Sequence, residues 1–218
     1  MSRSARGLFR ATGNVARPVM SDLINGEAVY QAESPREVDD FYPTPPEPIR
    51  GLLRVEAPYL DHSLPIWEPA AGDGAMVHEM RKAGYHVYAS DLIDRGCDAQ
   101  IQSFYDFNTA PSRQAITNPP FNECNTGDWI RHAFEVLDLD YMALLLPMGW
   151  PGAESRASLW AKHPPARVYL MRWRIDFTGA GAPPMLNAWF VWDRRKQVGE
   201  TQLHMLSRSD ASLTGDLF

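Results

Sequence analysis

The sequence predicts a doubly wound α/β protein with a mostly parallel sheet. Short β-prone runs alternate along the chain with segments of helical periodicity, as in a sheet covered by helices on both faces. The most apolar run, 141–147, is short and bounded, which is typical of a strand buried on both faces. A Gly-x-Gly loop joins the first predicted strand to a helix, which is a usual step in such a sheet.

Length and composition favour one globular domain with additions. The chain has 218 residues, of which 44% are hydrophobic and 22% charged. No window approaches the ~18 apolar residues of a membrane span, and the arginine-bearing start lacks the apolar segment of a signal peptide. An organelle transit peptide is the weaker interpretation of that start. Cys97 and Cys124 form no Cys-x-x-Cys motif and the histidines are scattered, so no metal is expected and a reducing cytoplasm fits.

The net charge of −6 hides an uneven distribution. Residues 1–18 carry four arginines and no acid, and residues 151–196 carry eight basic against three acidic residues. Residues 19–150 carry eight basic against 21 acidic residues. The basic segments could hold a polyanion or could be ordinary solvated surface, and the sequence leaves both open.

The chain begins with a predicted mobile arm, 1–38, holding a short helix near 19–24. A proline-rich extended loop follows at 39–48. Thr44 and Glu47 are spaced as a capping box at the start of a helix. The apolar face of that helix is expected to consist of Ile49, Leu52, Leu53 and Val55.

The first strand, 65–68, ends in a loop of small residues, and a helix follows. Gly72 and Gly74 in that loop permit a tight turn and close approach of a ligand to the backbone. The placement is that of nucleotide-binding loops in α/β folds, although a lone Gly-x-Gly is a weak signal.

Two acids further along could bind a nucleotide. Asp91 ends the second strand, 85–91, and lies 17 residues after Gly74. That is close to the ~20-residue spacing of a carboxylate that accepts ribose hydroxyls, but a turn aspartate is a common alternative. Asp106 lies among aromatic residues that could sandwich a nucleobase or could simply be core; they are Phe104, Tyr105 and Phe107.

A rigid corner follows the strand 114–117. Its residues are Asn118-Pro119-Pro120-Phe121. Two prolines fix φ, remove two N–H donors and hold the residues before them in extended conformation. Asn118 offers an amide and Phe121 a flat apolar face, which suits a planar ring bearing an amino group. An ordinary strand-to-loop turn is the alternative for this stretch alone.

The remaining elements continue the alternation and end in a loose polar tail. They are a helix at 128–137, a strand at 141–147, a helix at 154–163, a strand at 166–171, a Gly/Pro-rich loop at 177–184 and a strand at 186–192.

Together these segments resemble S-adenosylmethionine-dependent amino-methyltransferases, and are most similar to the prokaryotic and phage adenine-N6 DNA methyltransferases. The resemblance covers about residues 39–193. The Asn-Pro-Pro-aromatic motif is specific for enzymes that methylate a nitrogen conjugated to a planar group; RNA adenine, RNA guanine and protein glutamine methyltransferases use similar motifs. The resemblance rests on the 41–45 loop, the 68–74 loop, Asp91, Asp106 and residues 118–121.

The resemblance implies a Rossmann-like class I methyltransferase with a seven-stranded, mostly parallel sheet and an antiparallel edge strand carrying Trp189 and Trp192. It divides the chain into a flexible basic arm (1–38), a methyltransferase domain (39–197) with a candidate substrate-recognition insertion (148–184), and a C-terminal tail (198–218).

The cofactor implied by the resemblance is S-adenosylmethionine. Glu68 and the glycine loop surround its methionine part, Asp91 binds its ribose, and Asp106 holds its adenine with Phe107 or Tyr105. The N-terminal loop closes over it. The implied cofactor-binding residues are Phe41, Tyr42, Thr44, Glu68, Ala70, Gly72, Gly74, Asp91, Asp106 and Phe107.

The implied catalytic residues are Asn118, Pro119, Pro120 and Phe121. The Asn118 side-chain oxygen and the Pro119 carbonyl can each accept one N–H of an adenine amine, Pro120 stiffens the corner, and Phe121 stacks on the base. We expect methylation of adenine N6 in DNA with short or low sequence specificity, and no membrane or metal partner. RNA or protein-glutamine methylation and a silent nucleotide-binding module are the alternatives.

Overall fold

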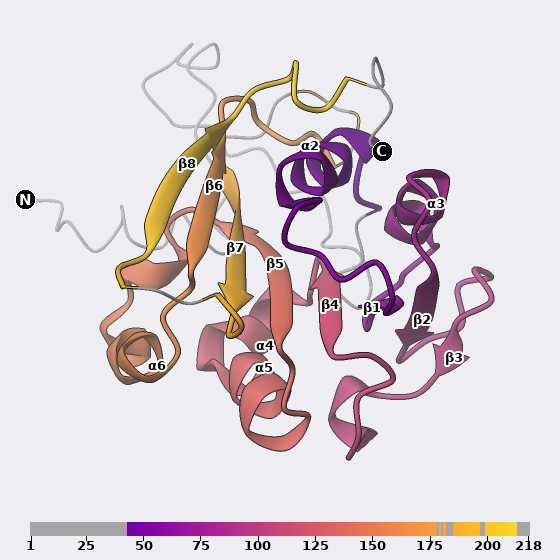
Figure 1. Ribbon diagram of the computed structural model, residues 1–218, viewed down its shortest axis with the longest axis horizontal. Helices are drawn as coiled ribbons and strands as arrows, with labels where there is room; N and C mark the ends of the chain where they lie inside the picture. The colour runs from indigo at the N-terminus through magenta and orange to yellow at the C-terminus, as the bar shows by residue number, and fades with distance from the viewer. Residues whose placement is uncertain (1–42, 178, 180, 182–184, 197–198, 213–218) are drawn as a thin grey trace, which may run out of the picture. The chain divides into compact units, whose positions relative to one another are not determined.

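The computed structural model describes residues 43–177, 179, 181, 185–196 and 199–212. Within them an eight-stranded sheet has the order β3-β2-β1-β4-β5-β7-β6-β8 (Figure 1). Neighbouring strands are parallel except at β5–β7 and β6–β7, so β7 alone runs in the opposite direction. The strands are β1 (Ile66–Glu68), β2 (Val87–Asp91), β3 (Gln100–Ile101), β4 (Gln114–Thr117), β5 (Tyr141–Pro147), β6 (Arg167–Met171), β7 (Asn187–Asp193) and β8 (Gln202–Leu206).

Short helices join these strands. The α-helices are α2 (Pro46–Glu56), α3 (Ala75–Lys82), α4 (Phe121–Thr126), α5 (Asp128–Arg131) and α6 (Ala157–Lys162). A π turn, His132–Val136, continues α5, and three 3-10 turns lie at Phe104–Asp106, Trp150–Gly152 and Glu154–Arg156.

The mostly parallel α/β fold predicted from the sequence is confirmed, but the sheet has eight strands rather than seven. The additional strand, β8, comes from the tail that was expected to be loose, and it pairs in parallel with β6. The predicted insertion 148–184 contains β6, so part of it belongs to the sheet. The predicted arm 1–38, its helix near 19–24, and Phe41 and Tyr42 lie outside the described residues.

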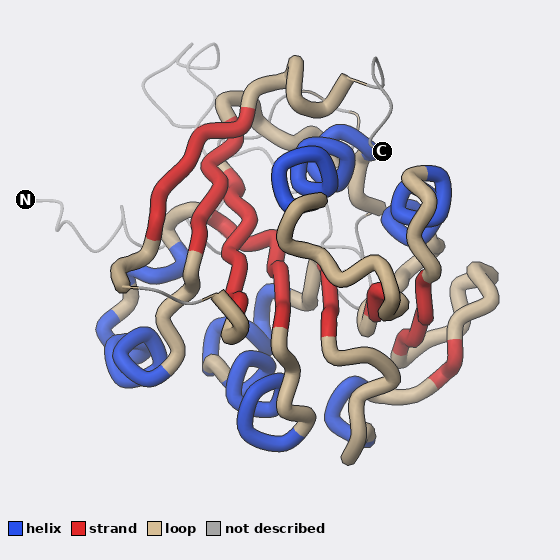
Figure 2. The backbone as a smooth tube through the Cα atoms, in the orientation of Figure 1, coloured by secondary structure: helices blue, strands red, loops and turns tan. Residues whose placement is uncertain are grey.

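Helices cover both faces of the sheet (Figure 2). The strand β5 shows why, because its first six residues are all buried. Leu144 and Leu146 pack in a cluster with residues of α4, α5 and α6, whereas Ala143 and Leu145 pack in a second cluster with residues of α2 and α3. A strand that buries alternate side chains in two different layers must be apolar throughout, which explains the continuous apolar run.

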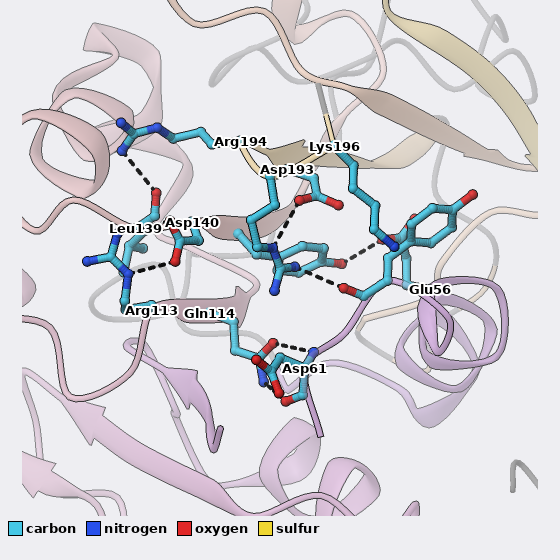
Figure 3. A network of polar contacts seen from close by, with 12 residues as sticks. Glu56, Asp61, Arg113, Gln114, Leu139, Asp140, Asp193, Arg194 and Lys196 are labelled. Atoms are coloured by element: carbon cyan, nitrogen blue, oxygen red, sulfur yellow. Dashed lines mark hydrogen bonds and ion pairs between the residues drawn. The ribbon is translucent and has the colours of Figure 1, made fainter. Parts of the chain in front are cut away.

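A buried polar network fixes the sheet to the end of α2 (Figure 3). Glu56, which is fully buried, accepts hydrogen bonds from Arg167 Nε at 2.7 Å and from the hydroxyl groups of Tyr141 at 3.0 Å and Tyr169 at 2.5 Å. Arg167 also donates to buried Asp193 at 3.0 Å. Burial opposes the charge on Arg167, but the bonds to Glu56 and Asp193 outweigh it and raise the pKa of the guanidinium.

This network also gives the direction of α2. Glu56 contacts the amino edge of the sheet, where β5 begins and β7 ends, whereas Trp189 in the middle of β7 donates to the Pro48 carbonyl at 2.9 Å. The start of α2 therefore lies toward the opposite, carboxyl edge, where β1, β2, β4 and β5 end. None of the described helices is long and apolar enough to cross a membrane.

Candidate active site

Three neighbouring parallel strands bring the predicted site residues to the carboxyl edge. Their order is β2-β1-β4, and their last residues are Asp91, Glu68 and Thr117. Parallel strands end at the same edge, which is where α/β sheets bind ligands. Two loops leave this edge: the glycine loop after β1 and the Asn118 corner after β4.

The glycine loop is bonded directly to the acid of the second strand. The Gly72 N–H donates to Asp91 Oδ2 at 2.7 Å, and the Ile93 N–H donates to Asp91 Oδ1 at 2.9 Å. Each carboxylate oxygen keeps a second lone pair for another donor. Asp91 is thus fixed in orientation and can still accept hydroxyl groups.

Gly74 caps α3 in a left-handed conformation, with φ of 85°. A Cβ atom here would lie 2.7 Å from the Cys97 Cβ, which is closer than real carbon atoms approach. The turn therefore requires glycine for both its backbone angle and its contact with the chain after β2.

Glu68 is a buried carboxylate without a cation beside it among the described residues. The Ala70 N–H donates to its Oε1 at 3.2 Å, whereas Oε2 is buried and receives no hydrogen bond from the residues that the structure describes. Burial raises the pKa of Glu68 well above its ordinary range, and the nearby Thr117 hydroxyl and the Ala70 N–H lower it only in part. The Thr117 hydroxyl itself has no well-formed hydrogen bond in the described part of the chain. Such a carboxylate is suited to a cationic ligand.

Asn118 is held by a residue 74 positions earlier in the chain. Its Nδ2 donates to Thr44 Oγ1 at 3.0 Å, and its Oδ1 is buried and has no hydrogen-bond partner among the described residues. The predicted capping box at Thr44 and Glu47 is wrong, since Pro45 is the N-cap of α2 and no side chain bonds there. Thr44 instead fixes which way the Asn118 amide points, leaving its oxygen available as an acceptor.

The two prolines lead directly into a helix that the sequence pattern did not reveal. Pro120 has φ of −57° and ψ of 116° and is the N-cap of α4, of which Phe121 is the first residue. Phe121 is half-buried and packs against the core cluster beneath α4 and α5. Its ring is anchored on one side by packing at the start of this helix.

The remaining predicted residues lie on the turn after β3. Asp106 is exposed at the end of a 3-10 turn, and Phe107 is buried with its ring centroid 5.0 Å from that of Trp67 in β1. The Phe104 ring stacks on the Trp129 ring with their centroids 4.0 Å apart, and Phe104 belongs to the hydrophobic core. No group of three or more His, Cys, Asp or Glu side chains that could hold a metal occurs among the described residues.

Two further polar residues at this edge were missed by the sequence interpretation. Thr117 is the last residue of β4, and Asn187 is the first residue of β7; both are buried and carry polar atoms without partners in the described chain. The available signal was a polar residue at the end of an otherwise apolar buried strand.

This fold also occurs in solved structures, among them two bacterial proteins. A protein from Listeria monocytogenes described as a class I S-adenosylmethionine-dependent methyltransferase matches with a TM-score of 0.50 and 14% identity, over 77% of this chain and 64% of that one. A protein from Vibrio vulnificus described as a modification subunit of a type I restriction enzyme matches with a TM-score of 0.51 and 11% identity, over 76% of this chain and 47% of that one. This chain thus spans less than two thirds of either structure.

The likeness establishes the Rossmann-like fold of class I methyltransferases for this chain. No protein-family profile and no curated protein sequence matches it.

Proposed function

We propose that this protein transfers a methyl group from S-adenosylmethionine to the exocyclic N6 amine of adenine in DNA. The observation that carries the proposal is the Asn118 amide at the end of β4: its Nδ2 donates to Thr44, and its buried Oδ1 has no partner in the described part of the chain. The fold shared with class I methyltransferases, one of them described as a restriction-enzyme modification subunit, supports the same reaction class.

The residues of β1 and β2 fit the proposed cofactor. Glu68 offers an unpaired, buried carboxylate oxygen for the α-ammonium group, and Asp91 offers oriented oxygens for the ribose hydroxyls. The glycine loop between them allows the close backbone approach that the methionine part requires. Asp106 and Phe107 would hold the adenine, while Phe41, Tyr42 and Thr44 would close over the cofactor. When bound, S-adenosylmethionine supplies a methyl group activated by a positively charged sulfur.

The corner after β4 supplies the acceptor side of the reaction. The lone pair of the adenine amine is delocalised into the ring, so the nitrogen is a poor nucleophile. Asn118 Oδ1 and the Pro119 carbonyl each accept one N–H bond, which favours a pyramidal nitrogen with its lone pair free. Pro120 keeps these acceptors fixed before the substrate arrives, and Phe121 stacks on the base. The nitrogen–methyl bond forms as the carbon–sulfur bond breaks, and the extra proton leaves to solvent.

The surface beside the site is suited to a polyanion. The segment leaving β6 at the carboxyl edge alternates exposed Arg172 and Arg174 with buried Trp173 and Ile175. Exposed arginines at this edge can contact phosphates. Duplex DNA would have to release the target base from the stack at a cost of a few kcal/mol. The segments that would recognise the DNA sequence are the arm 1–38 and parts of 148–184. Because both segments are short, we infer low sequence specificity.

The test is to incubate the protein with labelled S-adenosylmethionine and separate pools of DNA, RNA and protein, then to digest each pool and analyse it by mass spectrometry. We expect N6-methyladenine in the DNA pool. Label confined to RNA or to glutamine would assign the chain to one of the related reactions, and absence of label from all pools with retained cofactor binding would indicate a silent module.

A further inference from the structure

Asn187 is a second amide buried at the carboxyl edge. It is 1% exposed, and neither its Oδ1 nor its Nδ2 makes a hydrogen bond within the described part of the chain. The next five residues of β7, 188–192, are all apolar. A buried amide without hydrogen-bond partners destabilises the fold. An apolar residue at this position would therefore make the folded protein more stable, unless the amide binds a ligand.

The strand register places Asn187 beside the proposed methyl-acceptor corner. Asn187 pairs with Pro147 of β5, and Thr117 of β4 pairs with Leu144 of the same strand. The Met148 N–H donates to the Leu186 carbonyl at 2.9 Å, so β5 and β7 remain joined at this end. Two strand spacings separate β4 from β7, and Asn187 lies about two residues further along the strands than Asn118, so the two backbones lie roughly 12 Å apart.

Both amides lie on the face of the sheet that α2 covers. Side chains alternate along β7, so Asn187 shares a face with Trp189, which bonds to Pro48 of α2. Asn118 bonds to Thr44, immediately before α2. The proposed cofactor residues on β1 and β2 lie on one side of Asn118, and Asn187 lies on the other, where the substrate ring would be expected.

The chemistry of adenine identifies what this amide would bind. In the proposed reaction Asn118 and Pro119 accept both hydrogens of the N6 amine, and the ring atoms that flank this amine, N1 and N7, are acceptors. Only a donor can recognise them, and Asn187 Nδ2 is a donor that no described residue uses. Guanine carries a hydrogen on N1, so a donor that faces N1 would disfavour it, whereas N7 is an acceptor in both purines.

We propose that Asn187 is a specificity-determining residue whose Nδ2 donates a hydrogen bond to a ring nitrogen, N1 or N7, of the target adenine. This inference rests on the proposed function. In the present conformation the Asn187 side chain is only 1% exposed. The entering base would displace the atoms that cover this side chain and would accept the hydrogen bond from Nδ2.

The experiment compares Asn187→Leu, which keeps the approximate size and removes the polar atoms, with Asn187→Asp, which keeps the shape and removes the donor. Gln202→Leu is the matched control, because Gln202 is an exposed amide on β8 at the opposite edge of the sheet. Each protein is tested for melting temperature, cofactor Kd, and kcat/KM on oligodeoxynucleotides carrying adenine, 1-deazaadenine or 7-deazaadenine at a methylated position.

We expect Asn187→Leu to melt at or above the wild-type temperature and to bind the cofactor normally, while kcat/KM for adenine falls about 10- to 100-fold. The kcat/KM of the wild type should be lower by a similar factor on one of the two deaza substrates than on adenine. For both Asn187 variants, kcat/KM should be the same on that substrate and on adenine. Gln202→Leu should behave as the wild type throughout.

Wild-type kcat/KM in Asn187→Leu would overturn the inference. So would a lowered melting temperature with discrimination against the deaza base retained, because that pattern indicates a purely structural amide. If the wild type itself does not methylate adenine, the proposed function fails and this inference fails with it; that outcome is recognised from the wild type alone.

Discussion

Replacing Thr44 by valine tests whether this residue orients the catalytic amide. The substitution preserves the shape of the side chain and removes the hydroxyl that accepts the 3.0 Å hydrogen bond from Asn118 Nδ2. Thr44 is only 7% exposed, so water would not readily replace that acceptor. Losing the bond and leaving a buried donor unpaired costs about 1–3 kcal/mol. If this cost falls on the transition state, kcat decreases about 5- to 150-fold.

The assay is single-turnover methyl transfer at saturating DNA and cofactor, with the cofactor Kd measured separately by calorimetry. Thr44→Ser is the matched control, since it keeps the hydroxyl and should recover most of the wild-type rate. Cofactor affinity should change less than the rate of methyl transfer in Thr44→Val, because valine keeps the bulk that would close over the cofactor and loses only the acceptor for Asn118 Nδ2. If Thr44→Val instead keeps the wild-type rate at saturation and weakens cofactor binding, Thr44 does not orient the Asn118 amide and acts only by closing over the cofactor.

Three further predictions concern stability and cofactor binding. Glu56→Gln breaks the buried network at the end of α2 and should lower the free energy of unfolding in urea by about 3–5 kcal/mol, whereas Glu135→Gln at an exposed ion pair should leave it nearly unchanged. Gly74→Ala should lower stability more than Gly96→Ala and also weaken cofactor binding: both glycines have φ above 80°, but nothing lies within 4 Å of a Cβ at residue 96. Equal losses would show that the close contact at residue 74 is unimportant. Burial raises the pKa of Glu68, so the folded protein holds that proton more tightly than the unfolded chain does; without cofactor, stability should fall as pH rises from the ordinary glutamate pKa toward the raised one. Melting temperatures measured from about pH 4 to 8 should show this fall in the wild type and not in Glu68→Gln. The same pH dependence in both proteins would contradict the raised pKa of Glu68.

The ends of the central strands could be predicted from the sequence because their signals are local. The apolar run of β5, the glycine loop and the double proline each determine their own backbone within a few residues. The sequence alone therefore predicts that Asp91 and Glu68 lie at the same edge of a parallel sheet.

Contacts between distant segments could not be predicted in this way. The local pattern at Thr44 and Glu47 indicated a capping box, but the Thr44 hydroxyl bonds to Asn118, which only the folding of α2 over β4 brings near. The burial of Asn187 likewise depends on pairing with β5 and on coverage by neighbouring segments.

The eighth strand was missed for a related reason. Leu203 and Met205 of β8 are exposed and only Leu206 is buried, so the segment lacks the apolar signal of a core strand. It forms because β6 offers an unpaired edge along its full length, which a local pattern cannot reveal.

The catalytic role of the Asn118 amide is tested most directly by measuring DNA methylation and cofactor binding for the wild type and for Asn118→Ala. We predict that the wild type produces N6-methyladenine, and that Asn118→Ala binds S-adenosylmethionine normally while its rate of methyl transfer falls by orders of magnitude. An unchanged rate in Asn118→Ala would contradict the account, because the amide at the end of β4 would then have no part in the reaction.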